Sequence, residues 1–117
     1  MELSDLVRAL VGSDPLTARQ WIADASRENV QWSNLPWPEG LNLTEYAIAA
    51  GVAELLASRA GMNPPAWTSA VGAASEPVFL VRAALQMPRL RWSCEHEGPE
   101  PLRRRRVFAP PDFLTVA

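Results

Sequence analysis

The chain contains no lysine, and it has one cysteine, one histidine and one tyrosine. Cys94 alone cannot form an intramolecular disulfide, which fits a reducing compartment. With His96 it supplies two of the four ligands that a structural zinc site needs. The six glycines are scattered, so the chain lacks a glycine-rich phosphate loop and a nucleophile elbow. We therefore predict no metal and no cofactor.

Charge and hydropathy exclude two further classes of protein. Eleven arginines stand against thirteen acidic residues, which gives a net charge of −2, whereas proteins that coat nucleic acid are basic over a wide face. The longest weakly polar run, 46–53, is far short of the roughly 20 residues that span a bilayer. The first residues lack the positive flank and apolar core of a signal peptide. We expect a cytoplasmic protein whose 117 residues form one domain.

Two short amphipathic helices are predicted at the start. Ser4 is a candidate N-cap for a helix that runs to Val11, with apolar residues on one stripe. Asp14-Pro15 then begins a second helix, to about Glu28, in the preferred order of N-cap followed by proline. The segment 30–41 lacks periodicity and carries Trp32 and Trp37, so it is predicted to be a loop that buries indoles. Trp37 is either part of this packing or an exposed contact with a partner.

The strongest helix signal covers 42–60. Asn42 and Glu45 have the spacing of a capping box, and Gly61 is placed to end the helix. Small residues dominate this segment, which allows close approach of another helix, so we predict that it forms the centre of the core. A seam between two chains is the alternative role for such a helix.

The remainder is punctuated by proline. The stretch 63–68 is predicted to be a rigid corner sealed by Trp67. Residues 78–85 could form a strand by composition, but Pro77 and the Ala-Ala-Leu continuation favour a helix. Further helical segments are predicted at 88–94 and, as a last turn, at 113–117. The fold class is therefore all-α, a compact single-domain array of five to seven helices, several of them short. Within the domain, residues 1–41 supply two helices and the Trp/Pro loop, and 42–117 supply the central helix and a proline-punctuated module.

One cluster, Cys94-Glu95-His96-Glu97, invites a catalytic interpretation. Neighbouring residues point about 100° apart on a helix, so Cys94 and His96 would share a face only in extended structure. A polar connection before the proline-rich turn accounts for the cluster more simply. We therefore predict that the protein is not an enzyme.

The segment 103–106 consists of four consecutive arginines, whose guanidinium groups require carboxylates, phosphates, aromatic faces or solvent. Internal ion pairs are one interpretation, with candidate carboxylates at Glu95, Glu97, Glu100 and Asp112. Anchoring an acidic surface of a protein partner is the second, since arginine is enriched at interface hot spots. Contact with nucleic acid is the third, but no helix with base-reading residues accompanies the run.

Four motifs in the C-terminal half resemble a family of small helical bacterial proteins. They are Pro64-Pro65-Ala66-Trp67-Thr68, Pro77-x-Phe79-Leu80-Val81, Glu97-x-Pro99-x-Pro101-Leu102 followed by the arginine run and Val107-Phe108, and Phe113-Leu114-x-x-Ala117. Members of this family are often encoded beside an abortive-infection-type nucleotidyltransferase and are regarded as antitoxins. The resemblance covers about 53–117, and its most specific part is the proline turn with the arginine run.

The resemblance implies that the chain is the antitoxin of a toxin–antitoxin pair, which binds and neutralises a nucleotidyltransferase-like toxin. The candidate partner-binding residues are Arg103, Arg104, Arg105, Arg106, Phe108 and Trp37. The alternative is a small nucleic-acid-binding or autoregulatory protein that uses the same arginines on phosphates.

Overall fold

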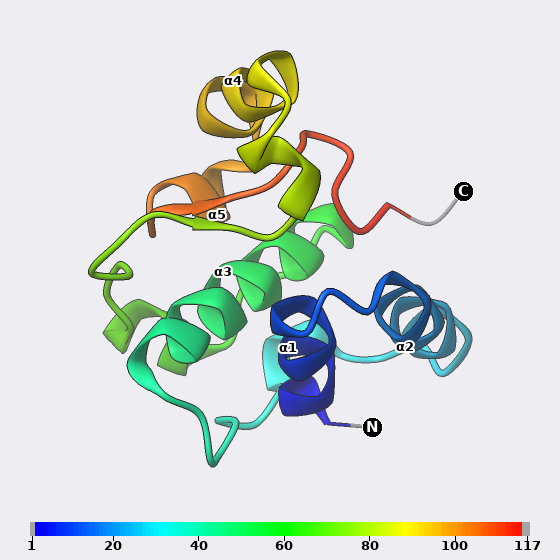
Figure 1. The fold of residues 1–117 in the computed structure, drawn as a ribbon. Helices are drawn as coiled ribbons and strands as arrows, with labels where there is room; N and C mark the ends of the chain where they lie inside the picture. The colour runs from blue at the N-terminus through cyan, green and yellow to red at the C-terminus, as the bar shows by residue number, and fades with distance from the viewer. Residues whose placement is uncertain (1, 116–117) are drawn as a thin grey trace.

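The longest helix, α3 (Leu43–Arg59), runs through the middle of the fold in the computed structural model, which describes residues 2–115 (Figure 1). The predicted capping box is confirmed. The Asn42 Oδ1 atom accepts from the Glu45 N–H at 2.8 Å, and the Glu45 Oε1 atom accepts from the Asn42 N–H at 3.0 Å. Gly61, with φ of 69°, follows the end of the helix. Ten of the eleven α3 positions from 47 to 57 are buried, the exception being Glu54, so α3 is the centre of the core as predicted.

Helices α1 (Leu3–Val11) and α2 (Pro15–Arg27) pack beside each other, and α1 also packs on α3 (Figure 1). Asp14 caps α2, as the sequence predicts. The prediction that Ser4 caps α1 was wrong. The N-cap is Glu2, which makes no side-chain hydrogen bond, because the buried Leu3 already belongs to the apolar face and draws Ser4 inside the first turn.

Two short 3₁₀ segments connect the loops to the core. In η1 (Trp32–Asn34), Trp32 is buried against Trp21, with ring centroids 6.2 Å apart. In η2 (Ala66–Ala70), the Trp67 Nε1–H donates to the Leu35 carbonyl at 2.9 Å. Of the two tryptophans in the predicted Trp/Pro loop, Trp32 is buried as expected, whereas Trp37 is 45% exposed.

The helix predicted for 78–85 was wrong. The structure has β1 (Val78–Phe79) followed by η3 (Arg82–Leu85), and β1 pairs in parallel with β2 (Val107–Phe108). The Val78 N–H donates to the Arg106 carbonyl at 2.9 Å, and the Leu80 N–H donates to the Phe108 carbonyl at 3.0 Å. This long-range pairing outweighs the local helix signal at Pro77.

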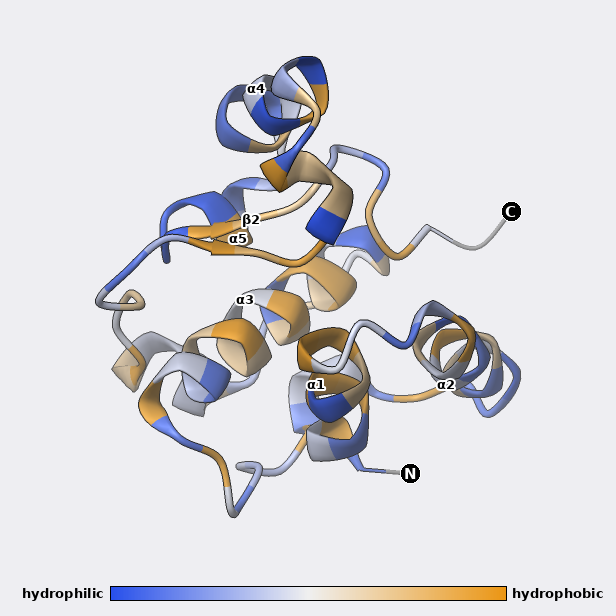
Figure 2. Cartoon of the chain, in the orientation of Figure 1, coloured by the Kyte–Doolittle hydropathy of each residue, from blue (hydrophilic) through white to orange (hydrophobic). Residues whose placement is uncertain are grey.

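Helix α4 (Pro88–Glu97) begins at Pro88, as predicted. Helix α5 (Glu100–Arg103) packs against α3. Apolar residues concentrate in α1, α3 and the strand pair, whereas α4 is largely hydrophilic and stands at the edge of the molecule (Figure 2). A turn joins Asp112 to Thr115, and the rest of the predicted last turn lies outside the described residues. With five α-helices and one two-residue strand pair in residues 2–115, the all-α class is confirmed.

Candidate functional site

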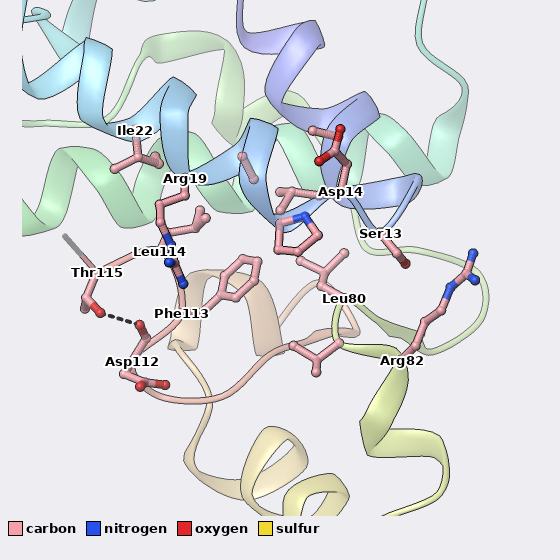
Figure 3. Close-up of a pocket in the computed structure, with 15 residues that line it drawn as sticks. Ser13, Asp14, Arg19, Ile22, Leu80, Arg82, Asp112, Phe113, Leu114 and Thr115 are labelled. Carbon is pink, nitrogen blue, oxygen red and sulfur yellow. Dashed lines mark hydrogen bonds between the residues drawn. The ribbon is translucent and has the colours of Figure 1, made fainter. Parts of the chain in front are cut away.

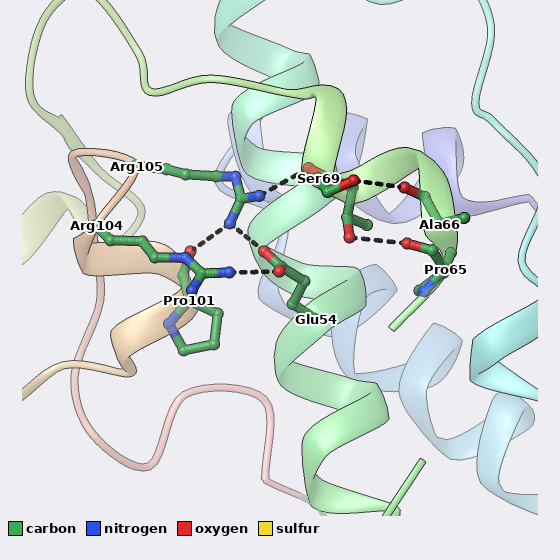
Figure 4. A network of polar contacts seen from close by, with 8 residues as sticks. Glu54, Pro65, Ala66, Ser69, Pro101, Arg104 and Arg105 are labelled. Atoms are coloured by element: carbon green, nitrogen blue, oxygen red, sulfur yellow. Dashed lines mark hydrogen bonds and ion pairs between the residues drawn. The ribbon is translucent and has the colours of Figure 1, made fainter. Parts of the chain in front are cut away.

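The arginine run meets α3 through one carboxylate, that of Glu54 (Figure 4). Arg104 contacts Glu54 Oε2 and Arg105 contacts Glu54 Oε1. Arg105 also donates to the Thr68 carbonyl at 2.9 Å and to the Pro101 carbonyl at 3.2 Å. The Arg105 side chain is 6% exposed and that of Glu54 is 11% exposed, so this pair is part of the interior. It joins α3, η2 and α5.

Burial affects the charge of Arg105 in its contact with Glu54 and Arg104. Desolvation lowers the pKa of Arg105 from its ordinary value, while the charge of Glu54 acts in the opposite direction and that of Arg104 lowers the pKa further. Two guanidinium groups share one carboxylate, so one positive charge of the pair Arg104 and Arg105 is not neutralised by Glu54. The Arg104 side chain, which is half-exposed, is the one that solvent or a partner can reach.

The outer two arginines hold main-chain carbonyls. Arg103 donates to the His96 carbonyl at 3.0 Å, and Arg106 donates to the Ser75 carbonyl at 2.9 Å. Arg106 remains exposed, with φ of 62°, whereas Arg103 is half-buried. Arg103 and Arg106 therefore contact two further segments, while Arg104 and Arg105 share Glu54, a carboxylate that was not among the candidates predicted from the sequence.

Phe108 lies on the strand pair. Its ring lies 5.3 Å from that of Phe79, its register partner, and both side chains are half-buried. The Arg91 guanidinium of α4 lies over the Phe79 ring, 5.1 Å from its centroid. Phe108 and Phe79 thus form an aromatic surface under the edge of α4.

Trp37 is 45% exposed, and its ring stacks on Tyr46 at 4.8 Å and meets Trp67 edge-on at 5.3 Å. Trp67 precedes Thr68, whose carbonyl accepts from Arg105. The segment η2 therefore contacts both Trp37 and the arginine run. Trp37 combines the two roles that the sequence left open, packing and exposure.

The structure adds a surface that sequence reasoning missed, formed by η3 and α4. Leu85 is 60% exposed, Met87 54% and Trp92 55%. We call these three side chains, together with Arg82 and Arg89, the α4 surface. Helix α4 turns Cys94 inward, which leaves the opposite positions to solvent. A tryptophan on the polar side of a short helix is the signal that could have identified this surface.

The two arginines of the α4 surface carry positive charge that no carboxylate in the described part of the chain pairs with. Among the described residues, no carboxylate lies within 4 Å of Arg82 or Arg89, whereas Arg91 faces Glu95 at 3.4 Å. The Trp92 ring stacks on His96, with centroids 4.7 Å apart.

The Cys94 cluster is divided by the helix. Cys94 is fully buried, and burial raises the pKa of its thiol, while His96 is exposed and its Nδ1 atom lies 2.9 Å from the Trp92 carbonyl oxygen. Residues 2–115 contain no group of three His, Cys, Asp or Glu side chains arranged to hold a metal ion. In the same range, no helix is long and apolar enough to cross a membrane.

Comparison with known proteins adds no relative: no family model, curated protein or solved structure matches this chain.

Proposed function

We propose that this chain is a non-enzymatic protein-binding module, and that it acts as an antitoxin that binds and neutralises a nucleotidyltransferase-like toxin. The observation that carries the binding role is the exposure of Leu85, Met87 and Trp92 within eight residues of chain. Clustered exposed apolar side chains mark interaction sites, whereas isolated ones are ordinary. Tryptophan, methionine and arginine are also the residue types enriched in protein interfaces.

The charge of the α4 surface favours an acidic partner. Arg82 and Arg89 belong to the same stretch of chain as the exposed apolar side chains, and neither has a carboxylate within 4 Å among residues 2–115. Guanidinium groups bind carboxylates through two parallel hydrogen bonds, and rim charges of this kind accelerate association and select partners. A partner that presents carboxylates around an apolar patch would complement this surface.

The identity of the partner rests on the resemblance of 53–117 to antitoxins of abortive-infection-type pairs. Within that stretch, the exposed side chains of Arg104 and Arg106 and the half-buried Phe108 are available for contact. They are the members of the predicted set that we expect to touch the toxin directly. Arg105 supports them from the interior.

To neutralise the toxin, such a module needs only to cover an entrance to the toxin's active site. A nucleotidyltransferase must admit a nucleotide and an acceptor into a concave site, and concave sites are few and small relative to a bound domain. Docking over either entrance blocks transfer without any chemistry by the antitoxin. This mechanism explains how a chain without a catalytic set can control an enzyme.

Co-purification tests the proposal. The chain, tagged at its N-terminus, is expressed with the neighbouring genes of its own locus, and the eluate is identified by native mass spectrometry. A stoichiometric nucleotidyltransferase-like partner is expected, and co-expression is expected to relieve the growth arrest that this partner causes alone. Elution alone, or with nucleic acid in a complex that weakens steeply with salt, would overturn the proposal and favour a nucleic-acid-binding protein.

Two variants locate the contact once a partner is identified. Trp92→Ala is expected to weaken the complex at least tenfold, because an exposed tryptophan in an apolar cluster is a typical hot spot. Leu43→Ala is the matched control, since Leu43 is 89% exposed but lies at the start of α3, outside the α4 surface. Equal affinities for the two variants would remove the α4 surface from the interface.

A further inference from the structure

Strand β1 has one edge that no other strand covers in the described part of the chain. In the parallel pair, the Val78 and Leu80 N–H groups donate to two carbonyls of the β2 segment, so the backbone groups of these two residues face β2. Backbone groups alternate in direction along a strand, so those of Phe79 point away from β2. Val81 continues the extended backbone, with φ of −115° and ψ of 110°.

The polar groups along this edge have no partner. Among residues 2–115, the Phe79 N–H, the Phe79 carbonyl and the Val81 N–H make no hydrogen bond. They present a donor, an acceptor and a donor in succession. An extended backbone supplies the matching acceptor, donor and acceptor at the same spacing.

A cavity of about 180 Å³ adjoins this edge. Its lining includes residues 78–80 but neither residue of β2, which places it on the side of β1 away from β2. The end of α1 and the start of α3 form the opposite walls, and Val11, which is 47% exposed, is a lining side chain that an incoming segment can reach. The volume is below the range of small-molecule sites, about 300–1,000 Å³, and suits a side chain that another chain presents.

The formal charges around the edge cancel. Arg82 and Glu45 line the smaller cavity, and the Glu45 carboxylate already accepts from the Asn42 N–H. A larger cavity of about 410 Å³ adjoins residues 80–82, and two arginines and two aspartates line it (Figure 3). Complementarity of charge therefore favours an uncharged occupant over an anion or a cation.

We propose that β1 accepts a third strand, an uncharged extended segment of a protein partner that pairs with Phe79 and Val81 and places a branched aliphatic side chain in the smaller cavity. Free strand edges are templates for such pairing, in which main-chain hydrogen bonds give affinity and pockets for alternate side chains give specificity. The edge leads into η3, where the α4 surface begins. Pairing at β1 does not depend on the antitoxin role.

A synthetic hexapeptide that alternates valine and threonine, with both ends capped, tests the site. Titration is expected to shift the amide resonances of 78–82. On binding, the Phe79 and Val81 N–H groups are expected to exchange more slowly with solvent. The Val78 and Leu80 N–H groups, which already pair with β2, are expected to keep their exchange rates.

Methylation of the peptide backbone separates strand pairing from apolar contact. One version of the peptide carries N-methyl groups on its valines and the other on its threonines. Only alternate amides of an added strand face its neighbour, so one version is expected to bind about tenfold more weakly and the other to bind like the unmodified peptide.

A matched pair of variants locates the cavity. Val11→Asp is expected to weaken binding of the peptide about fivefold or more, because it places a charge against the apolar side chain that enters. Leu16→Asp is the control, since Leu16 is 75% exposed and lines neither cavity. Both native side chains are exposed, so both variants are expected to fold.

Four results would overturn the proposal: no binding of the peptide, shifts that map to the α4 surface instead, equal binding of the two methylated versions, or equal binding to Val11→Asp and Leu16→Asp. Shifts of Phe79 and Val81 that depend on protein concentration without peptide would also overturn it, and would assign the edge to a second copy of this chain. None of these outcomes depends on which protein co-purifies.

Discussion

Arg105 and Glu54 form a nearly buried ion pair across 51 positions of the chain. Glu54 is the point at which the arginine run reaches the central helix, and the Thr68 and Pro101 carbonyls also accept from Arg105, whereas its buried Nε atom has no hydrogen-bond partner among the described residues (Figure 4). A feature that looks like a surface motif in the sequence is therefore partly a structural one. Of the four arginines, Arg105 is buried, Arg103 is half-buried, and Arg104 and Arg106 are exposed.

Arg105→Ala is expected to lower the free energy of unfolding by about 3–5 kcal/mol, because it leaves the Glu54 carboxylate buried without Arg105, its more buried partner. Arg104→Ala is expected to cost at most about 1 kcal/mol, since the Arg104 side chain is half-exposed and solvent screens its pairing. Urea unfolding of the two variants beside the unmodified chain measures the difference. Similar losses of unfolding free energy in the two variants would contradict the assignment of Arg105 to the interior and Arg104 to the surface.

A second variant separates charge from shape at Arg105. Arg105→Lys retains the positive charge but cannot serve Glu54, Pro101 and Thr68 together through a planar fork. It is expected to be closer in stability to Arg105→Ala than to the unmodified chain. Recovery of full stability by lysine would show that charge alone holds this site.

Local signals in the sequence predicted the elements that depend on local chemistry. The Asn42 capping box, the Asp14-Pro15 start and the Pro88 start all involve residues at most three positions apart, and each begins a helix in the structure. The Ser4 cap failed because burial of Leu3 decided where α1 begins. Long-range contacts decided the remaining errors.

Two features could not be predicted because their partners are distant in the chain. Val78 pairs with Val107, and η3, α4 and α5 lie between the two strands in the chain. Glu54 was not among the carboxylates considered for the arginine run, since helical spacing and sequence proximity favour nearer residues. The α4 surface was missed for another reason: exposure of Trp92 depends on which side of α4 Cys94 occupies.

Gly98→Ala is expected to destabilise the fold by about 1–3 kcal/mol through overpacking. A Cβ atom at Gly98 would lie 2.4 Å from the Ala109 carbonyl oxygen and 2.6 Å from that of Cys94, and both obstacles are backbone atoms. Gly72→Ala is the control, because a Cβ there meets nothing within 4 Å, and it is expected to be neutral or to stabilise by up to about 1 kcal/mol. Thermal unfolding distinguishes the two. A neutral Gly98→Ala would show that the α4–α5 junction relaxes freely.

Asp14 is expected to make the stability of the fold depend on pH in the acidic range. Hydrogen bonds from Thr17 lower the pKa of Asp14 in the folded state, so its contribution is present above the unfolded pKa and is lost as the pH falls through the folded pKa. Asp14→Ala is therefore expected to melt at a lower temperature than the unmodified chain at pH 7. The difference should shrink in strong acid, where the carboxyl group is protonated in both states. A gap between the melting temperatures that stays constant with pH would contradict this account.

Alanine variants of Trp92 and Trp37 are expected to differ in their effects on partner binding and on stability. Trp37 contacts Tyr46 and Trp67, and each aromatic pair contributes about 0.5–1.5 kcal/mol, so Trp37→Ala is expected to lower the free energy of unfolding by about 1–3 kcal/mol. Trp92 stacks only on the exposed His96 among the described rings, so Trp92→Ala is expected to cost less than about 1 kcal/mol.

Affinity for the co-purified partner is expected to show the reverse order, because the Trp92 indole is free to enter an interface while that of Trp37 is held by its neighbours. Urea unfolding and a pull-down at equal protein concentration measure the two quantities on the same variants. If Trp37→Ala abolishes the complex and retains full stability, the contact with the partner lies on the Trp/Pro loop instead of the α4 surface.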